Sequence, residues 1–86
     1  MNEIQLNELK SRAEKLKNEP VYYEINIQGK MILVDGVFSK IGEMQGIGEV
    51  GEHLSYKIEG IILTPTGKSI RRPLLEIVQF IESKKH

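Results

Sequence analysis

The sequence has no cysteine, no excess of either charge and no apolar run of the roughly 20 residues that a membrane helix needs. Without cysteine there can be no disulfide and no thiolate zinc site. Twelve Lys and Arg residues balance twelve Asp and Glu residues over 86 positions, so no overall field attracts nucleic acid or anionic membrane. The first residues, MNEIQLNELK, lack the basic start and apolar centre of a signal peptide. We therefore expect a cytoplasmic protein of one domain with no membrane segment.

Motifs that would carry chemistry are also scarce. The only two histidines, His53 and His86, have no partner at metal-ligand spacing, and nothing orders His53 as a general base beside a serine. Residues 46–51, GIGEVG, formally match G-x-G-x-x-G, but the residues that follow alternate like a strand where a dinucleotide site needs a helix N-terminus. The carboxylates are scattered along the chain. The sequence therefore predicts no enzyme, no catalytic residue, no cofactor site and no metal site.

The expected fold is organised around residues 29–41, GKMILVDGVFSKI. Their β-branched side chains favour a strand, whereas Asp35 and Gly36 are disfavoured in a flat one. We expect one long strand, bent at Gly36, with apolar neighbours covering both sides of its first half. After the bend, strict alternation puts Val37 and Ile41 on one face. Such a bend lets one strand serve two walls of a small barrel. The alternative is two short strands joined by a turn.

Two elements are expected before this strand. Residues 2–18 carry apolar residues at helical spacing, which predicts a helix that plugs one end of the barrel. Residues 21–28 alternate between apolar and polar side chains, which is typical of a half-buried strand. A very short connection at Gly29 and Lys30 joins this strand to the bent one as an antiparallel hairpin.

The elements expected after it are less regular. Residues 42–52 are rich in glycine and glutamate and favour a loop or a ragged edge hairpin. A strand over 53–64, a turn over 64–67 and a short rim strand over 68–72 follow.

The tail, residues 73–82, is ambiguous. A helix is one interpretation, because four apolar residues recur at helical spacing and follow a proline: Leu74, Ile77, Val78 and Ile81. The segment IVQFIE is equally typical of a buried strand. Given the family resemblance described below, we expect a tight turn over 73–76 and a strand over 77–82.

The best local signal for binding is a group of cations on the expected rim strand. They are Lys68, Arg71 and Arg72, with Lys57 near them. The pattern is typical of a contact for phosphate or for an acidic protein surface. The alternative is solubilising charge that protects an edge strand from aggregation. Tyr22, whose ring lies on the polar face of the first strand, is a second candidate contact, or a residue packed beneath a neighbouring loop.

This order of elements is that of an SH3-like barrel of the Sm-like kind. We expect a mainly β protein with an N-terminal helix and about five strands, residues 1–86 forming a single domain with a bent antiparallel barrel over 21–82. The segments NEPVYYEINI, VFSKI and RRPLLEIVQFIE, with Gly29 and Gly36 seven residues apart, resemble the YolD-like family of Gram-positive bacteria and their phages. In that family the closing segment is a turn and then a strand. Ile41-Gly42 departs from the family's usual Ile-Asp.

The resemblance implies a non-catalytic protein-interaction module that regulates a Y-family DNA polymerase in the DNA-damage response. Two alternatives stay open. One is a phage or mobile-element inhibitor of a host defence enzyme, and the other is an Sm-like binder of RNA or DNA that assembles into a ring. The open edges of a small barrel also make a homo-oligomer physically reasonable.

Overall fold

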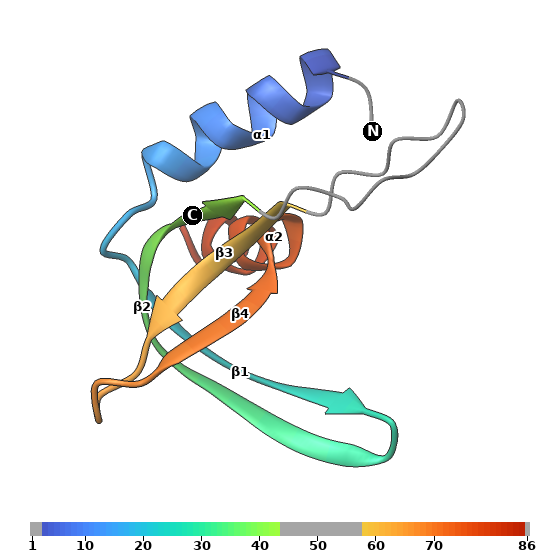
Figure 1. Ribbon diagram of the computed structural model, residues 1–86, viewed down its shortest axis with the longest axis vertical. Helices are drawn as coiled ribbons and strands as arrows, with labels where there is room; N and C mark the ends of the chain where they lie inside the picture. The colour runs from blue at the N-terminus through green and yellow to red at the C-terminus, as the bar shows by residue number, and fades with distance from the viewer. Residues whose placement is uncertain (1–2, 44–57, 86) are drawn as a thin grey trace.

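A computed structural model describes residues 3–43 and 58–85, and Figure 1 shows its elements. In chain order they are α1 (Glu3–Glu14), β1 (Pro20–Ile27), β2 (Lys30–Glu43), β3 (Ile58–Leu63), β4 (Ser69–Pro73) and α2 (Leu74–Lys84). The four strands form one antiparallel sheet in the order β1-β2-β3-β4. The sheet curves around α2, which contacts β1, β3 and β4, and α1 packs against α2 and β2 (Figure 1).

The N-terminal helix is confirmed, although it is shorter than the expected 2–18. After Glu14 the chain turns, and Asn18 adopts a left-handed conformation with φ of 74°. Asparagine tolerates this region better than most residues with a side chain. The backbone N–H of Asn18 then donates to the carbonyl of Phe38 at 2.7 Å, so the connection is already held against β2 before β1 begins.

The β1–β2 hairpin is also confirmed, but its turn consists of Gln28 and Gly29, one residue earlier than the expected Gly29 and Lys30. Both have positive φ, 51° and 84°, as a type I′ turn requires. The N–H of Gly29 donates to the side-chain oxygen of Asn26 at 2.9 Å. The register runs from Ile27 opposite Lys30 to Pro20 opposite Val37.

Strand β2 is one continuous strand, so the alternative of two short strands is wrong. Its first half pairs with β1 on one edge and its second half pairs with β3 on the other, with Val37 paired on both sides. At Gly36 the strands approach so closely that a Cβ atom would lie 2.2 Å from the carbonyl oxygen of Leu63. Glycine is therefore needed here for close backbone approach.

A register shift between Phe38 and Lys40 changes which residues face the core. Phe38 precedes the shift and is fully buried by regular alternation with Val34, and the extra residue inserted at this β-bulge turns Ile41 towards the core as well. Val37 therefore lies on the opposite face from Ile41, and the expectation that they share a face is wrong. The expectation that both sides of residues 31–34 are covered is also wrong, because Met31 is 60 % and Leu33 45 % exposed.

The tail forms the helix α2, which corrects the expected turn and strand. Its four residues at helical spacing, Leu74, Ile77, Val78 and Ile81, are at most 3 % exposed, while Gln79 faces solvent. Pro73 ends β4 and precedes the first helical turn, so the chain passes from sheet to helix without a loop. With a helix where a fifth strand was expected, the described residues form an unclosed sheet, and the mainly β class with an N-terminal helix is what is confirmed.

The core lies between the concave face of the sheet, α2 and α1. Its buried side chains are Leu9, Ala13, Leu16, Val21, Val34, Phe38, Ile62, Leu74, Ile77, Val78 and Ile81. Gly60 lets α2 come close to β3, because a Cβ there would lie 2.6 Å from the Cδ1 atom of Ile77. The expected third strand corresponds to β3, with residues 53–57 outside the described ranges, and the expected rim strand corresponds to β4. Neither α1 nor α2 is long and apolar enough to cross a membrane.

Candidate interaction surface

The cations singled out from the sequence do not form one surface. Arg71 points to the outer, convex face of the sheet, where its Nη1 lies 3.4 Å from a carboxylate oxygen of Glu59. Arg72 is the next residue along β4 and therefore points to the inner face, towards α2. Lys68 lies in the turn before β4 and is exposed, and Lys57 lies outside the described residues.

Arg72 belongs to a polar cluster between the sheet and α2. Its guanidinium donates two hydrogen bonds of 2.8 Å to the carboxylate of Glu76, and the hydroxyl of Tyr23 donates to the same carboxylate. The hydrogen bonds from Arg72 hold the pKa of Glu76 below its ordinary value. Burial raises the pKa of Tyr23, and its hydrogen bond to Glu76 adds to that increase. Glu76 is therefore ionised and Tyr23 protonated near neutral pH.

An aromatic contact extends this cluster along α2. The rings of Tyr23 and Phe80 are 4.9 Å apart between centroids, and the ammonium of Lys84 lies 5.6 Å from the Phe80 centroid. Arg72, Glu76, Phe80 and Lys84 follow one another at spacings of four residues, and Tyr23 on β1 faces them. The cluster joins β1 to α2 across the concave side of the sheet. Its polar groups are paired with one another, so the cluster links β1 and β4 to α2.

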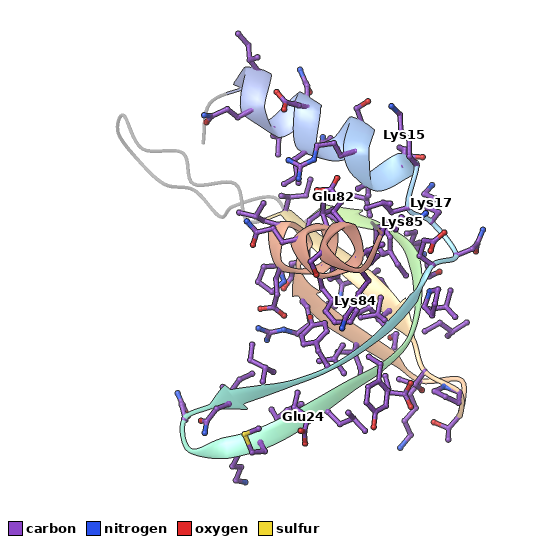
Figure 2. The ribbon with its side chains drawn as sticks, turned by 180° about the vertical axis from the view of Figure 1, so that it is seen from behind. Lys15, Lys17, Glu24, Glu82, Lys84 and Lys85 are labelled. Carbon is purple, nitrogen blue, oxygen red and sulfur yellow. The ribbon has the colours of Figure 1, made fainter. Side chains whose placement is uncertain are left out.

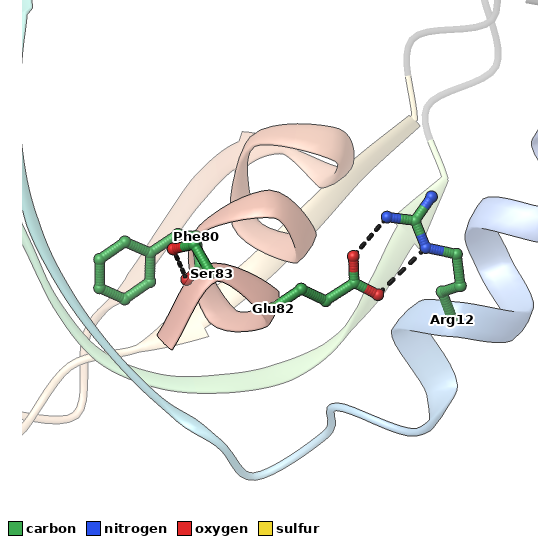
Figure 3. Close-up of polar contacts among 4 residues, drawn as sticks. All are labelled: Arg12, Phe80, Glu82 and Ser83. Carbon is green, nitrogen blue, oxygen red and sulfur yellow. Dashed lines mark hydrogen bonds and ion pairs between the residues drawn. The ribbon is translucent and has the colours of Figure 1, made fainter. Parts of the chain in front are cut away.

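A second ion pair joins the two helices. The guanidinium of Arg12 on α1 forms a bidentate ion pair with the carboxylate of Glu82 on α2 (Figure 3). Its Nε donates to Oε2 at 3.1 Å, and its Nη2 donates to Oε1. This contact lowers the pKa of Glu82. Beside it lies a groove of about 350 Å³ lined by Gln5, Glu8, Leu9, Arg12 and Leu75. The groove is open and lined by more polar than apolar surface, which is not typical of a small-molecule site.

The outer face of the sheet, in contrast, presents large apolar side chains. Tyr22 is 63 % exposed and Leu63 48 %, alongside the exposed Met31 and Leu33. Together with Val37 these residues form what we call the outer-face patch: Tyr22, Met31, Leu33, Val37 and Leu63. The pairing register places them on one side of neighbouring strands, because Tyr22 is diagonal to both Leu33 and Val37, and Leu63 is directly opposite Val37.

Sequence reasoning found Tyr22 but missed the other four members of the patch. Met31, Leu33 and Val37 carried a visible signal, because the residues of β2 are apolar on both faces of the strand. The signal was interpreted as burial on both sides, whereas α2 covers only the inner side. Val34 is fully buried there while Leu33, its neighbour, faces outwards. The apolar character of both faces of β2 therefore corresponds to one buried face and one exposed face.

No group of three His, Cys, Asp or Glu side chains within the described ranges is arranged to hold a metal ion. No family model, no curated protein and no solved structure matches the chain.

Proposed function

We propose that this protein is a non-catalytic protein-interaction module and that the outer-face patch is its docking surface. The observation that carries the proposal is the exposure of five large apolar side chains on one uncovered face of the sheet. Contiguous apolar patches on soluble proteins mark interaction sites, because leaving such surface in water has a free-energy cost that a partner removes. Tyrosine and methionine, both present in the patch, are enriched at protein interfaces.

The partner that we propose is a Y-family DNA polymerase, as for a YolD-like accessory protein with an SH3-like fold. The features that support this kinship are the N-terminal helix, the hairpin that follows it and the long strand with glycine at position 36. The helix α2 departs from the turn and strand that close the family's fold. This departure leaves the outer-face patch unchanged, because α2 lies on the other side of the sheet.

Nucleic-acid binding is less well supported by the described surface. A nucleic-acid site needs free cations to contact phosphates, yet Arg71 and Arg72 are each engaged by a glutamate. A defence enzyme as the partner would use the same apolar surface, and the experiment below separates it from a polymerase by the identity of the captured protein.

The test is capture of partners from DNA-damaged Gram-positive cells with the tagged full chain, compared with the variant Leu33→Asp. The variant Ile4→Asp is the matched control, since Ile4 is a 77 % exposed apolar residue on α1, outside the patch. The proposal predicts that the wild type and Ile4→Asp retain a Y-family polymerase or a replication protein and that Leu33→Asp does not.

If a nuclease or another defence effector were captured in stoichiometric amount, the protein would be an inhibitor of a host defence enzyme and not a regulator of a polymerase. Retention of nothing by the wild type, or equal retention by Leu33→Asp, would refute the patch as the docking surface.

A further inference from the structure

Two carboxylates lie within the outer-face patch. Glu24 is directly opposite Leu33, and Asp35 is directly opposite Tyr22. Both side chains therefore share the outer face with the apolar residues, and Glu24 and Asp35 are diagonal neighbours across the strand pair. Diagonal neighbours in an antiparallel pair are about 7–8 Å apart, close enough for two like charges to repel each other.

No cation within the described residues balances these two carboxylates. The ion pairs found there are Arg12–Glu82, Lys17–Glu14, Arg71–Glu59, Arg72–Glu76 and Lys85–Glu19. Lys30 is opposite Ile27 and by alternation lies on the inner side, and Lys40 is opposite Ile61 of β3, beyond the end of the β1–β2 pairing. Figure 2 shows Glu24 on the hairpin, whereas Lys15, Lys17 and Lys85 gather near the C-terminal ends of the two helices.

We infer that the partner segment that docks on the outer-face patch is a protein segment that presents cationic and apolar side chains next to one another. This inference deepens the proposed function and rests on it. Lys or Arg side chains of such a partner would approach Glu24 and Asp35 and relieve their repulsion, while its apolar side chains would cover Leu33, Met31 and Tyr22. Complementary charges of this kind set partner choice and association rate.

The same two carboxylates argue against other occupants of the patch. Nucleic acid and anionic membrane are repelled by them. A second copy of this chain, packed through the same face about a two-fold axis that passes between Glu24 and Asp35, would place the carboxylates of one copy against those of the other. The occupant that fits the charge is thus a basic segment of a different protein.

The test uses two synthetic amphipathic peptides of about 18 residues, or five helical turns. Both carry the same leucine stripe, one with lysine and the other with glutamate at every polar position. Each carries a fluorescent label, and its binding to the full-length chain is measured by anisotropy. The measurements are made at about 0.1 M and about 1 M salt, between which the Debye length falls from about 10 Å to about 3 Å.

We expect the wild type to bind the lysine peptide about tenfold more tightly than the glutamate peptide at low salt, because the two carboxylates attract lysine and repel glutamate. The preference should shrink at high salt. The double variant Glu24→Lys/Asp35→Lys should reverse it, since two cations would then replace the two carboxylates on the outer face, where Glu24 is exposed and Asp35 half-buried. The control Glu8→Lys/Glu14→Lys, with the same change of net charge on α1, should keep the wild-type preference.

Equal affinity for the two peptides, preference for the glutamate peptide or no binding at all would overturn the inference. So would a control that loses the preference as fully as the patch variant, because the effect would then follow net charge alone. These outcomes leave the proposed function standing, because that function is decided by capture of a partner and its loss with Leu33→Asp.

Discussion

The residue whose replacement tests the architecture most directly is Gly36. It lies in β2 opposite Val21 of β1, at the point where β3 leaves the other edge of the strand. A Cβ added there would lie 2.2 Å from the carbonyl oxygen of Leu63 and 2.8 Å from its carbonyl carbon. Non-bonded carbon atoms are comfortable at about 3.5 Å or more, so β3 would have to retreat by about 1 Å in the variant Gly36→Ala.

The expected cost of Gly36→Ala is about 3 kcal/mol in the free energy of unfolding. Overpacking a fitted core costs about 1–3 kcal/mol, and the upper end applies because the obstructing atoms belong to the backbone of a paired strand and cannot rotate away. A chain of 86 residues has a total stability of about 4–13 kcal/mol, so a loss of this size is large. It corresponds to a fall in Tm of about 12–24 °C.

The assay is urea unfolding followed by circular dichroism, with Gly42→Ala as the matched control. Gly42 lies in the same strand, but the nearest atoms to its added Cβ are the ends of the Ile61 and Arg71 side chains, at 3.0 and 3.2 Å. Those side chains can move, so the control should stay within about 0.5 kcal/mol of the wild type. If Gly36→Ala is as stable as Gly42→Ala, close approach of β3 is not what requires glycine at this position.

Three further predictions concern the two faces of β2 and the cluster on α2. Val34→Ala should lower the free energy of unfolding by about 2 kcal/mol because the Val34 side chain is fully buried, and Leu33→Ala should lower it by at most about 0.5 kcal/mol. The reverse order in urea unfolding would disprove the assigned faces. Glu76→Gln should cost about 1–2 kcal/mol at pH 7 by weakening the Arg72 contact. Because the pKa of Glu76 is lowered in the fold, that stabilisation should disappear as the pH falls below about 4.3. If the free energies of unfolding of wild type and variant changed in parallel with pH, the prediction would be contradicted. Tyr23 has a raised pKa, so in thermal melts the stability advantage of the wild type over Tyr23→Phe should be constant below about pH 10 and shrink above it. An advantage that is undiminished above about pH 10 would count against the hydrogen bond from Tyr23 to Glu76.

The elements that depend on local signals could be predicted from the sequence. The stripe containing Leu9, Ala13 and Leu16 gave the N-terminal helix, and these residues are buried as a helical stripe requires. The alternation from Val21 to Ile27 gave β1, whose odd-numbered side chains face inwards. A very short connection was also predicted, but at Gly29 and Lys30, whereas the turn at Gln28 and Gly29 sets the register of the hairpin.

The tail could not be predicted because two periodicities fit the same residues. Ile77 and Ile81 lie on the apolar side in both a helix and a strand, so they do not discriminate. The decision comes from the concave side of the sheet, which is filled by a helix that packs against Phe38 and Ile62. Gly60, which permits this approach, could not be recognised as a contact point for α2 before the arrangement of the elements was known.

The candidate surface was predicted in part for a related reason. Tyr22 was found because an aromatic ring interrupts the polar face of β1, which is visible in a single strand. Met31 and Leu33 were expected to be buried because burial and exposure to a partner leave the same apolar pattern. Arg72 pairs with Glu76 because α2 is a helix that begins immediately after β4. Since this helix was not expected from the sequence, Arg72 could not be distinguished from the other cations of the expected rim strand.

The inserted residue at Ser39 gives this part of the chain a position that it can lose without changing which side chains face the core. Phe38 is opposite Ile62 and Lys40 is opposite Ile61, so deleting Ser39 alone would join these two pairs in regular alternation and leave Lys40 outside and Ile41 inside. A single deletion in the part of β2 that pairs with β1 has no such extra residue to remove, and it would shift the register of that pairing. Evolutionary loss of a single position should therefore be tolerated at Ser39 and not between Lys30 and Gly36.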